Sequence, residues 1–138
     1  LVEHVEDLLD RYGSDVSYLF ELIDEEPTLR ESLKEAPEYL RAEIAFGIKY
    51  EGALHLEDLV RRRTRLCYER RDRGLAAAEE IAEIAAGILG WSDEIKREEL
   101  ENYKRYCAAE KKAEEMQDEV EAQQEMLKAD GITEFKIG

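Results

Sequence analysis

The chain has 138 residues and a mass of 16.0 kDa, enough for one domain with a buried core. Its 35 acidic and 20 basic residues give a net charge of -15, which repels phosphate backbones, so we expect no nucleic-acid partner. The 40% charged residues and only two prolines predict a helical chain. The sequence has no apolar run long enough for a bilayer and no secretion signal, so we expect a soluble, cytoplasmic chain.

Two helices are predicted at the start of the chain. The first carries an apolar stripe at three- and four-residue spacing and ends at Gly13. Its stripe consists of Val2, Val5, Leu9 and Tyr12. Ser14 is expected to cap the second helix, which Pro27 interrupts. Its apolar face consists of Val16, Leu19 and Ile23, with Tyr18 and Leu22 beside them.

A third and a fourth helix are predicted in the middle of the chain. Pro37 suits the first turn of the third helix, where its missing N–H costs nothing, and Gly52 is expected to close this helix. Its inward positions are Leu40, Ile44, Gly47 and Ile48. The fourth helix is expected to run from near Leu56 through the arginines and to stop around Cys67.

Small residues form the seam of a fifth helix that Gly90 ends. The seam consists of Leu75, Ala78, Ala82, Ala85 and Leu89, in which the three alanines are the small residues. Ser92 then starts a last helix that reaches about Ala129, and we make no prediction for the tail 131–138. This helix has heptad spacing at Tyr106, Ala109, Ala113, Met116, Val120 and Leu127. We therefore predict an all-α bundle of five or six helices, with the long C-terminal helix docked along it in part.

Signatures of chemistry are missing from the sequence. With 35 acidic residues, carboxylate pairs at a catalytic spacing occur by chance and do not indicate catalysis. Neither His4 nor His55 lies in a nucleophile motif. We expect His4 at the surface and His55 at the start of a helix. No glycine-rich phosphate loop is present, and Cys67 and Cys107 form no metal-binding spacing, so we expect ordinary thiols. The sequence predicts no catalytic residue, no cofactor-binding residue and no metal site, and the acidic run 24–26 is expected to be a solvated helix end.

Arginines cluster between residues 61 and 73, where seven of them accompany two carboxylates and give a local charge of +5. Glu57 and Asp58 can pair with Arg61 and Arg62 at the favoured four-residue spacing. Arginine forks bind carboxylates and phosphates. Three destinations stay open for the remaining guanidinium groups: carboxylates of this domain, a missing domain of the same chain, or an anionic ligand such as a lipid headgroup.

At this cluster the sequence resembles the C-terminal domain of FAD-dependent glycerol-3-phosphate dehydrogenases. The matching elements are Arg41-Ala42-Glu43-Ile44, Tyr50-Glu51-Gly52-Ala53, Leu56-Glu57-Asp58-Leu59 and Arg62-Arg63-Thr64-Arg65-Leu66. The turn Arg11–Ser14 and the helix from Gly74 to Trp91 match as well, so the resemblance covers about residues 8–110. We predict a helical cap domain at 1–110 and a helical extension of unknown role at 111–138.

The resemblance implies a parent flavoprotein that oxidises sn-glycerol 3-phosphate to dihydroxyacetone phosphate and passes electrons through FAD to membrane quinone, or to oxygen in an oxidase branch. In that family the FAD and substrate domains precede this segment and hold the catalytic residues. This chain would be a non-catalytic piece, as its start at Leu1 rather than Met also suggests. Its expected partners are the preceding domain, another copy in a homo-oligomer, and a membrane surface reached through a parent that is peripheral on the inner face of the cell membrane.

A buried or interdomain ion-pair network is the expected role of the matching charged residues. Its members are Glu43, Glu51, Asp58, Arg62, Arg63 and Arg65. Such a network would fix the relative orientation of the segments that it joins more than it would stabilise the fold. The reason is that desolvation of the charged groups offsets most of the Coulombic gain. The alternative function is a free-standing helical interaction module that uses the heptad seam of the last helix.

Overall fold

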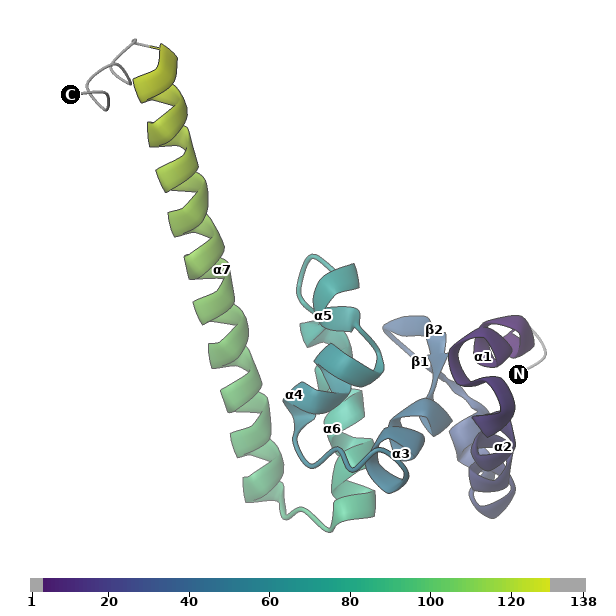
Figure 1. The fold of residues 1–138 in the computed structure, drawn as a ribbon. Helices are drawn as coiled ribbons and strands as arrows, with labels where there is room; N and C mark the ends of the chain where they lie inside the picture. Colours follow the sequence, from purple (N-terminus) through teal and green to yellow (C-terminus); the bar gives the residue numbers. More distant parts are fainter. Residues whose placement is uncertain (1–3, 130–138) are drawn as a thin grey trace. The chain divides into compact units, whose positions relative to one another are not determined.

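The computed structural model describes residues 4–129, so Val2 and the tail 131–138 lie outside the described residues. The chain divides into two units, of which the first ends at Tyr103 and the second begins at Lys104. The predicted all-α class with a long C-terminal helix is confirmed, although the first unit also contains a small two-stranded sheet (Figure 1).

The first helix, α1 (Val5–Tyr12), buries a different stripe from the predicted one. Leu8 and Tyr12 are buried one turn apart, whereas Leu9 is 50% exposed. Leu8 and Leu9 both fit the three- and four-residue spacing to Val5 and Tyr12, and the core lies on the side of Leu8. Gly13 ends the helix as predicted, with a φ of 56° that favours glycine.

The expected N-cap at Ser14 is wrong. A 3-10 turn, η2 (Gly13–Asp15), leads directly into α2 (Val16–Glu25), whose first turn has no side-chain cap. Because the backbone is already helical at Asp15, no extended residue stands before α2 to act as a cap. The predicted inner face of α2 is largely confirmed, since Leu19, Leu22 and Ile23 are buried.

Pro37 lies in a strand and does not open a helix. After the 3-10 turn η3 (Pro27–Arg30), β1 (Ser32–Leu33) pairs antiparallel with β2 (Ala36–Leu40), and the register shifts between the two residues of β1. A proline without an N–H suits an edge strand as well as a first helical turn, so the sequence alone could not separate the two. Glu80 holds this hairpin, because its carboxylate accepts a bond from Lys34 N at 2.8 Å and pairs with Arg41 at 2.6 Å.

The central helix of the first unit is α3 (Arg41–Lys49), which has seven consecutive buried residues from Ala42 to Ile48. It lies between α2 and α6 in Figure 1, so nearly all of its surface is covered. The helix ends at Lys49, three residues before the expected stop at Gly52. The main cluster of buried residues is Leu8, Tyr12, Leu19, Leu22, Ile23, Leu29, Leu40, Ala42, Ala45 and Phe46.

The predicted helix from Leu56 to Cys67 is broken into three parts. These are a single turn, α4 (Leu56–Asp58), a π-helical turn, η4 (Leu59–Arg63), and a second short helix, α5 (Leu66–Glu69). Arg65, between η4 and α5, has a left-handed backbone with φ of 60°, which no α-helix can continue through. Apolar periodicity cannot reveal such a break, because it reports which faces are buried.

Two predictions at the end of the first unit are confirmed. The small-residue helix α6 (Leu75–Leu89) ends at Gly90, which has a φ of 73° and donates its N–H to Ala86 O. Ser92 caps α7 (Asp93–Ala129), since its Oγ accepts the N–H of Ile95 at 3.2 Å. The described part of the second unit is the continuation of α7 from Lys104.

Candidate functional site

The arginine cluster is built around a sharp turn at Thr64, which is fully buried. Its Oγ1 lies 3.2 Å from the carbonyl oxygens of Leu59 and Val60 and accepts a bond from Leu66 N at 3.3 Å. Because Leu59 O also accepts the backbone N–H of Thr64 at 3.0 Å, both the backbone and the side chain of Thr64 hold the end of the π-helical turn. The turn at Thr64 also separates Arg61, Arg62 and Arg63, which precede it, from Arg65, which follows it.

Arg63 points into the domain. Its guanidinium group forms an ion pair with Glu51 and lies 4.7 Å from the ring centre of Tyr12 and 5.9 Å from that of Phe46. A cation over aromatic faces is attracted by the ring quadrupole. Arg63 thus joins η4 to α1 and to α3.

Gly47 is what allows this close approach. A Cβ atom at this position would lie 3.2 Å from Cγ and Cδ of Arg63 and 3.2 Å from Cδ2 of Leu59. The absence of a side chain on this turn of α3 therefore lets η4 pack directly against the helix.

Glu43 is the centre of the most buried polar network, with 1% of its surface exposed. Its carboxylate lies 2.8 Å from Nη2 of Arg11 and accepts bonds from Tyr12 Oη at 3.0 Å and Leu40 N at 2.7 Å. Burial, followed by the nearby Glu43 charge, raises the pKa of Tyr12 above its ordinary value, so this hydroxyl stays a donor. The network fixes the start of α3 against α1.

Two further arginines of the cluster reach carboxylates of the same domain. Arg61 pairs with Glu57 at 3.0 Å, as the four-residue spacing predicts, and Arg70 pairs with Glu38 on β2. Arg65 is exposed and has its guanidinium carbon 5.7 Å from the ring centre of Tyr68. Much of the positive charge is therefore used inside the first unit, the first of the three destinations left open by the sequence.

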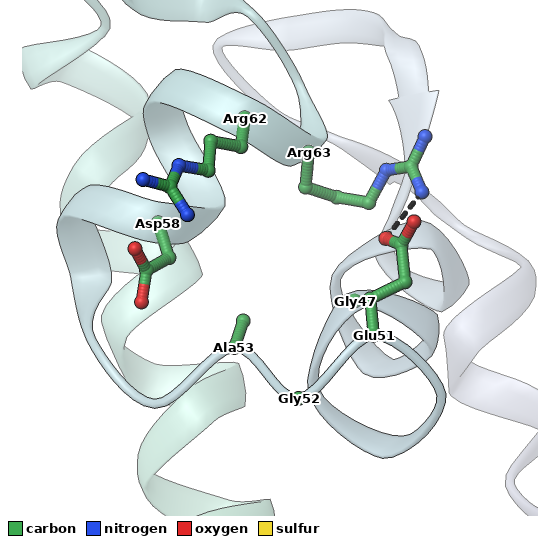
Figure 2. Close-up of a pocket in the computed structure, with 7 residues that line it drawn as sticks. All are labelled: Gly47, Glu51, Gly52, Ala53, Asp58, Arg62 and Arg63. Carbon is green, nitrogen blue, oxygen red and sulfur yellow. Dashed lines mark hydrogen bonds and ion pairs between the residues drawn. The ribbon is translucent and has the colours of Figure 1, made fainter.

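A cleft of about 200 Å³ lies between α3 and η4 (Figure 2). Asp58 and Arg62 stand on one wall, and the Glu51–Arg63 pair stands on the other. Gly52 and Ala53 form the intervening loop, with Ala53 N donating to Gly47 O at 3.0 Å. Within residues 4–129, Arg62 forms no ion pair.

The structure divides the predicted network into separate groups. Arg63 joins Glu51, whereas Asp58 and Arg62 line the cleft without the ion pair that their spacing suggests, within the described residues. Glu43 pairs with Arg11 and is linked to Arg63 through Tyr12, whose hydroxyl donates to Glu43 and over whose ring Arg63 lies, and Arg65 contacts Tyr68 instead. Sequence reasoning missed Arg11 and Tyr12 as partners of Glu43, because they are more than thirty residues away along the chain. The matching Arg11–Ser14 turn was the one signal that could have drawn attention to them.

His55 stands at the start of α4, as predicted, and contacts the beginning of α7. Its Nδ1 lies 2.8 Å from Oε1 of Glu99, whose other oxygen accepts a bond from Leu56 N at 3.1 Å. This hydrogen bond, together with the Glu99 charge, raises the pKa of His55. His4 is half-buried, and its Nε2 donates to Pro37 O at 2.6 Å.

Metal sites and membrane spans are two other kinds of feature that residues 4–129 could contain. Across residues 4–129, no cluster of three or more histidine, cysteine, aspartate or glutamate side chains has the arrangement of a metal site. In the same range, no helix combines the length and the apolar character that crossing a membrane requires. Cys67 and Cys107 are both buried.

Comparison with known proteins gives consistent matches. A family model described as the C-terminal domain of alpha-glycerophosphate oxidase matches residues 2–96. Glycerol-3-phosphate dehydrogenase 2 of Mycobacterium tuberculosis is 41% identical over 125 residues, which cover 91% of this chain and 21% of that protein. Glycerol-3-phosphate dehydrogenase of Mycobacterium leprae is 40% identical over the same shares.

A more distant relative has the same kind of name. The probable mitochondrial glycerol-3-phosphate dehydrogenase of Dictyostelium discoideum is 37% identical over 73% of this chain and 16% of its own length. The chain thus spans about a fifth of the length of the mycobacterial relatives. No solved structure matches it. The chain belongs to the family of the C-terminal domain of alpha-glycerophosphate oxidase, which is also the C-terminal domain of glycerol-3-phosphate dehydrogenases.

Proposed function

We propose that this chain is the non-catalytic C-terminal domain of a longer flavoprotein that oxidises sn-glycerol 3-phosphate to dihydroxyacetone phosphate, with electrons passed through FAD to quinone. The observation that carries the proposal is the 41% identity to a glycerol-3-phosphate dehydrogenase over nearly the whole chain. The same comparisons favour it over a free-standing interaction module.

The cleft at Arg62 does not suit FAD. Its volume of about 200 Å³ is below the roughly 300–1,000 Å³ of ordinary small-molecule pockets, and FAD is a large dinucleotide. Two of the four charged groups that line it, Glu51 and Arg63, are already paired with each other. We assign FAD, and the hydride transfer that it would accept, to the preceding part of the polypeptide, as the resemblance implies.

The role that remains for this domain is support of the catalytic part. Its paired arginines hold short elements together: Arg63 joins η4 to α1 and α3, and Arg11 joins α1 to α3. Such a scaffold can present a fixed surface to a neighbouring domain. A quinone acceptor also requires the parent to reach a membrane surface, and we propose a peripheral location on the inner face of the cell membrane.

The test is to express the chain together with its natural upstream sequence and to purify the whole polypeptide. We expect flavin absorbance that is bleached by glycerol 3-phosphate, and oxidation of this substrate with a quinone analogue as acceptor. Glycerol and glycerol 2-phosphate are matched control substrates and should leave the flavin oxidised. A polypeptide without flavin, or one that glycerol 3-phosphate does not reduce, would contradict the proposal.

Two additional measurements define the finer points. Activity with a quinone analogue should exceed activity with oxygen, and the reverse result would identify an oxidase instead. After cell lysis, the polypeptide should sediment with membranes at low salt and leave them at high salt or high pH. Recovery in the supernatant at low salt would contradict the peripheral location.

A further inference from the structure

Two exposed side chains flank the loop of the cleft along the chain, Tyr50 before it and Leu54 after it. We define the Tyr50 face as these two residues, Tyr18, whose ring meets that of Tyr50, and the cleft residues Asp58 and Arg62. Tyr50 is 48% exposed and Leu54 is 61% exposed. The ring of Tyr50 lies 5.2 Å from those of Tyr18 and Phe46, so it is held in place by its neighbours. An exposed but ordered tyrosine costs little conformational entropy when a partner covers it.

Arg62 places a guanidinium group on this face that a docking partner would need to pair. It is exposed, its guanidinium group lies on the same side of the cleft as the Asp58 side chain in Figure 2, and it forms no ion pair with any residue in the range 4–129. The opposite wall is closed by Glu51 and Arg63, which satisfy each other. A guanidinium fork that lacks an ion-pair partner matches a single carboxylate, and a volume of about 200 Å³ can accept one side chain.

We infer that the Tyr50 face is the docking site for a segment of the same polypeptide that precedes residue 1, and that an Asp or Glu side chain of this segment enters the cleft and pairs with Arg62. This inference rests on the proposed function. The matched residues make up 21% of the Mycobacterium tuberculosis relative, and the matching family is a C-terminal domain, so most of such a protein lies before it. Tyrosine and arginine are the residues that most often anchor interfaces.

A second copy of this chain is a poorer occupant. Each copy carries a net charge of -15, so two copies repel each other over most of their surfaces. A carboxylate on a neighbouring domain of the same polypeptide needs no such encounter, because the covalent link supplies a high effective concentration.

Photo-crosslinking in the full-length polypeptide tests the docking directly. We would place a benzophenone amino acid at position 50 and, as a matched control, at position 20. Phe20 is also an exposed aromatic residue and lies on the side of α2 opposite Tyr18. We expect position 50 to capture a peptide that precedes residue 1, at least tenfold more efficiently than position 20. Capture of residues 1–138 of another copy, or equal yields from both positions, would overturn the inference.

Charge reversal tests the carboxylate. In the full-length polypeptide, Arg62→Glu should speed proteolysis at the junction before residue 1 at least fivefold, and replacing the acidic residue of the captured segment by Lys should restore resistance. Arg71→Glu is the matched control, an exposed arginine of the same cluster, and should have no effect. A captured segment without an acidic residue, or equal proteolysis of the two variants, would contradict the pairing. Flavin binding and substrate oxidation by the unsubstituted polypeptide test the proposed function only. Crosslinking and proteolysis test the docking site only, so the two can fail independently.

Discussion

Glu43 and Arg62 belong to the same predicted network, yet they have opposite environments. Glu43 is buried and holds Arg11, Tyr12 and the backbone of Leu40 at the start of α3. Arg62 is exposed beside an open cleft and has no ion pair within residues 4–129. A charged residue that folding has already paired holds the domain together, whereas one left over at the surface is available to a partner.

The largest expected effect is at the buried end of this comparison. Glu43→Ala leaves Tyr12 Oη and Leu40 N without their partner and removes the acceptor of Arg11. Removing one member of a buried pair costs about 3–5 kcal/mol, and the partial exposure of Arg11 places our expectation near 3 kcal/mol. Urea unfolding of the chain measures it. The matched control is Glu57→Ala, which breaks an exposed pair and should cost less than about 0.5 kcal/mol; equal costs for the two variants would refute the distinction.

A smaller effect is expected where α3 meets Arg63. Gly47→Ala places a Cβ atom 3.2 Å from the Arg63 and Leu59 side chains, and such overpacking costs about 1–3 kcal/mol. The better helix propensity of alanine offsets about 1 kcal/mol, so we expect a net loss of about 1 kcal/mol. Thermal unfolding measures this loss.

Gly87→Ala in α6 is the matched control, because nothing lies within 4 Å of a Cβ atom there. It should stabilise the chain by up to about 1 kcal/mol. If Gly47→Ala stabilised the chain as much as Gly87→Ala does, the close packing at Arg63 would be contradicted.

The smallest predicted effect concerns the exposed His55. Its hydrogen bond to Glu99 raises its pKa above the ordinary value of 6.5, so the folded protein binds the proton more tightly than the unfolded chain. The resulting stabilisation is fully present below the unfolded pKa and is lost as pH rises through the folded pKa. We therefore compare the urea midpoint at pH 5.5 with that at pH 8.5 in each protein. The midpoint should fall more between these pH values in the wild type than in His55→Gln. Identical pH dependence in the two proteins would exclude this contribution.

The sequence predicted the elements that depend on apolar spacing and terminal glycines. The stop at Gly90 and the cap at Ser92 are local signals that the structure confirms. Of the predicted α6 seam, Ala78, Ala82 and Ala85 are buried, whereas Leu75 and Leu89 at its ends are half-buried. Pro37 and Ser14 were misassigned because each residue type suits more than one local structure, and tertiary contacts decide between them.

The site was harder to predict than the helices. Charged residues at the right spacing were visible, but 35 acidic residues offered many partners to each arginine. The pairing of Glu43 with Arg11 is set by the packing of α1 against α3, and the turn at Thr64 sends Arg63 inward. Neither can be read from spacing, because both depend on contacts between distant segments.

The division between inward and outward arginines is tested most directly by comparing the melting temperatures of Arg63→Ala and Arg62→Ala in this chain. Arg63→Ala loses the contacts with Tyr12 and Phe46 and the pair with Glu51, about 1–2 kcal/mol together, which should lower the melting temperature by about 5 °C. Arg62→Ala should change it by less than about 1 °C, because it breaks no ion pair among residues 4–129. A shift below about 1 °C for Arg63→Ala, or an equal loss for Arg62→Ala, would contradict the account.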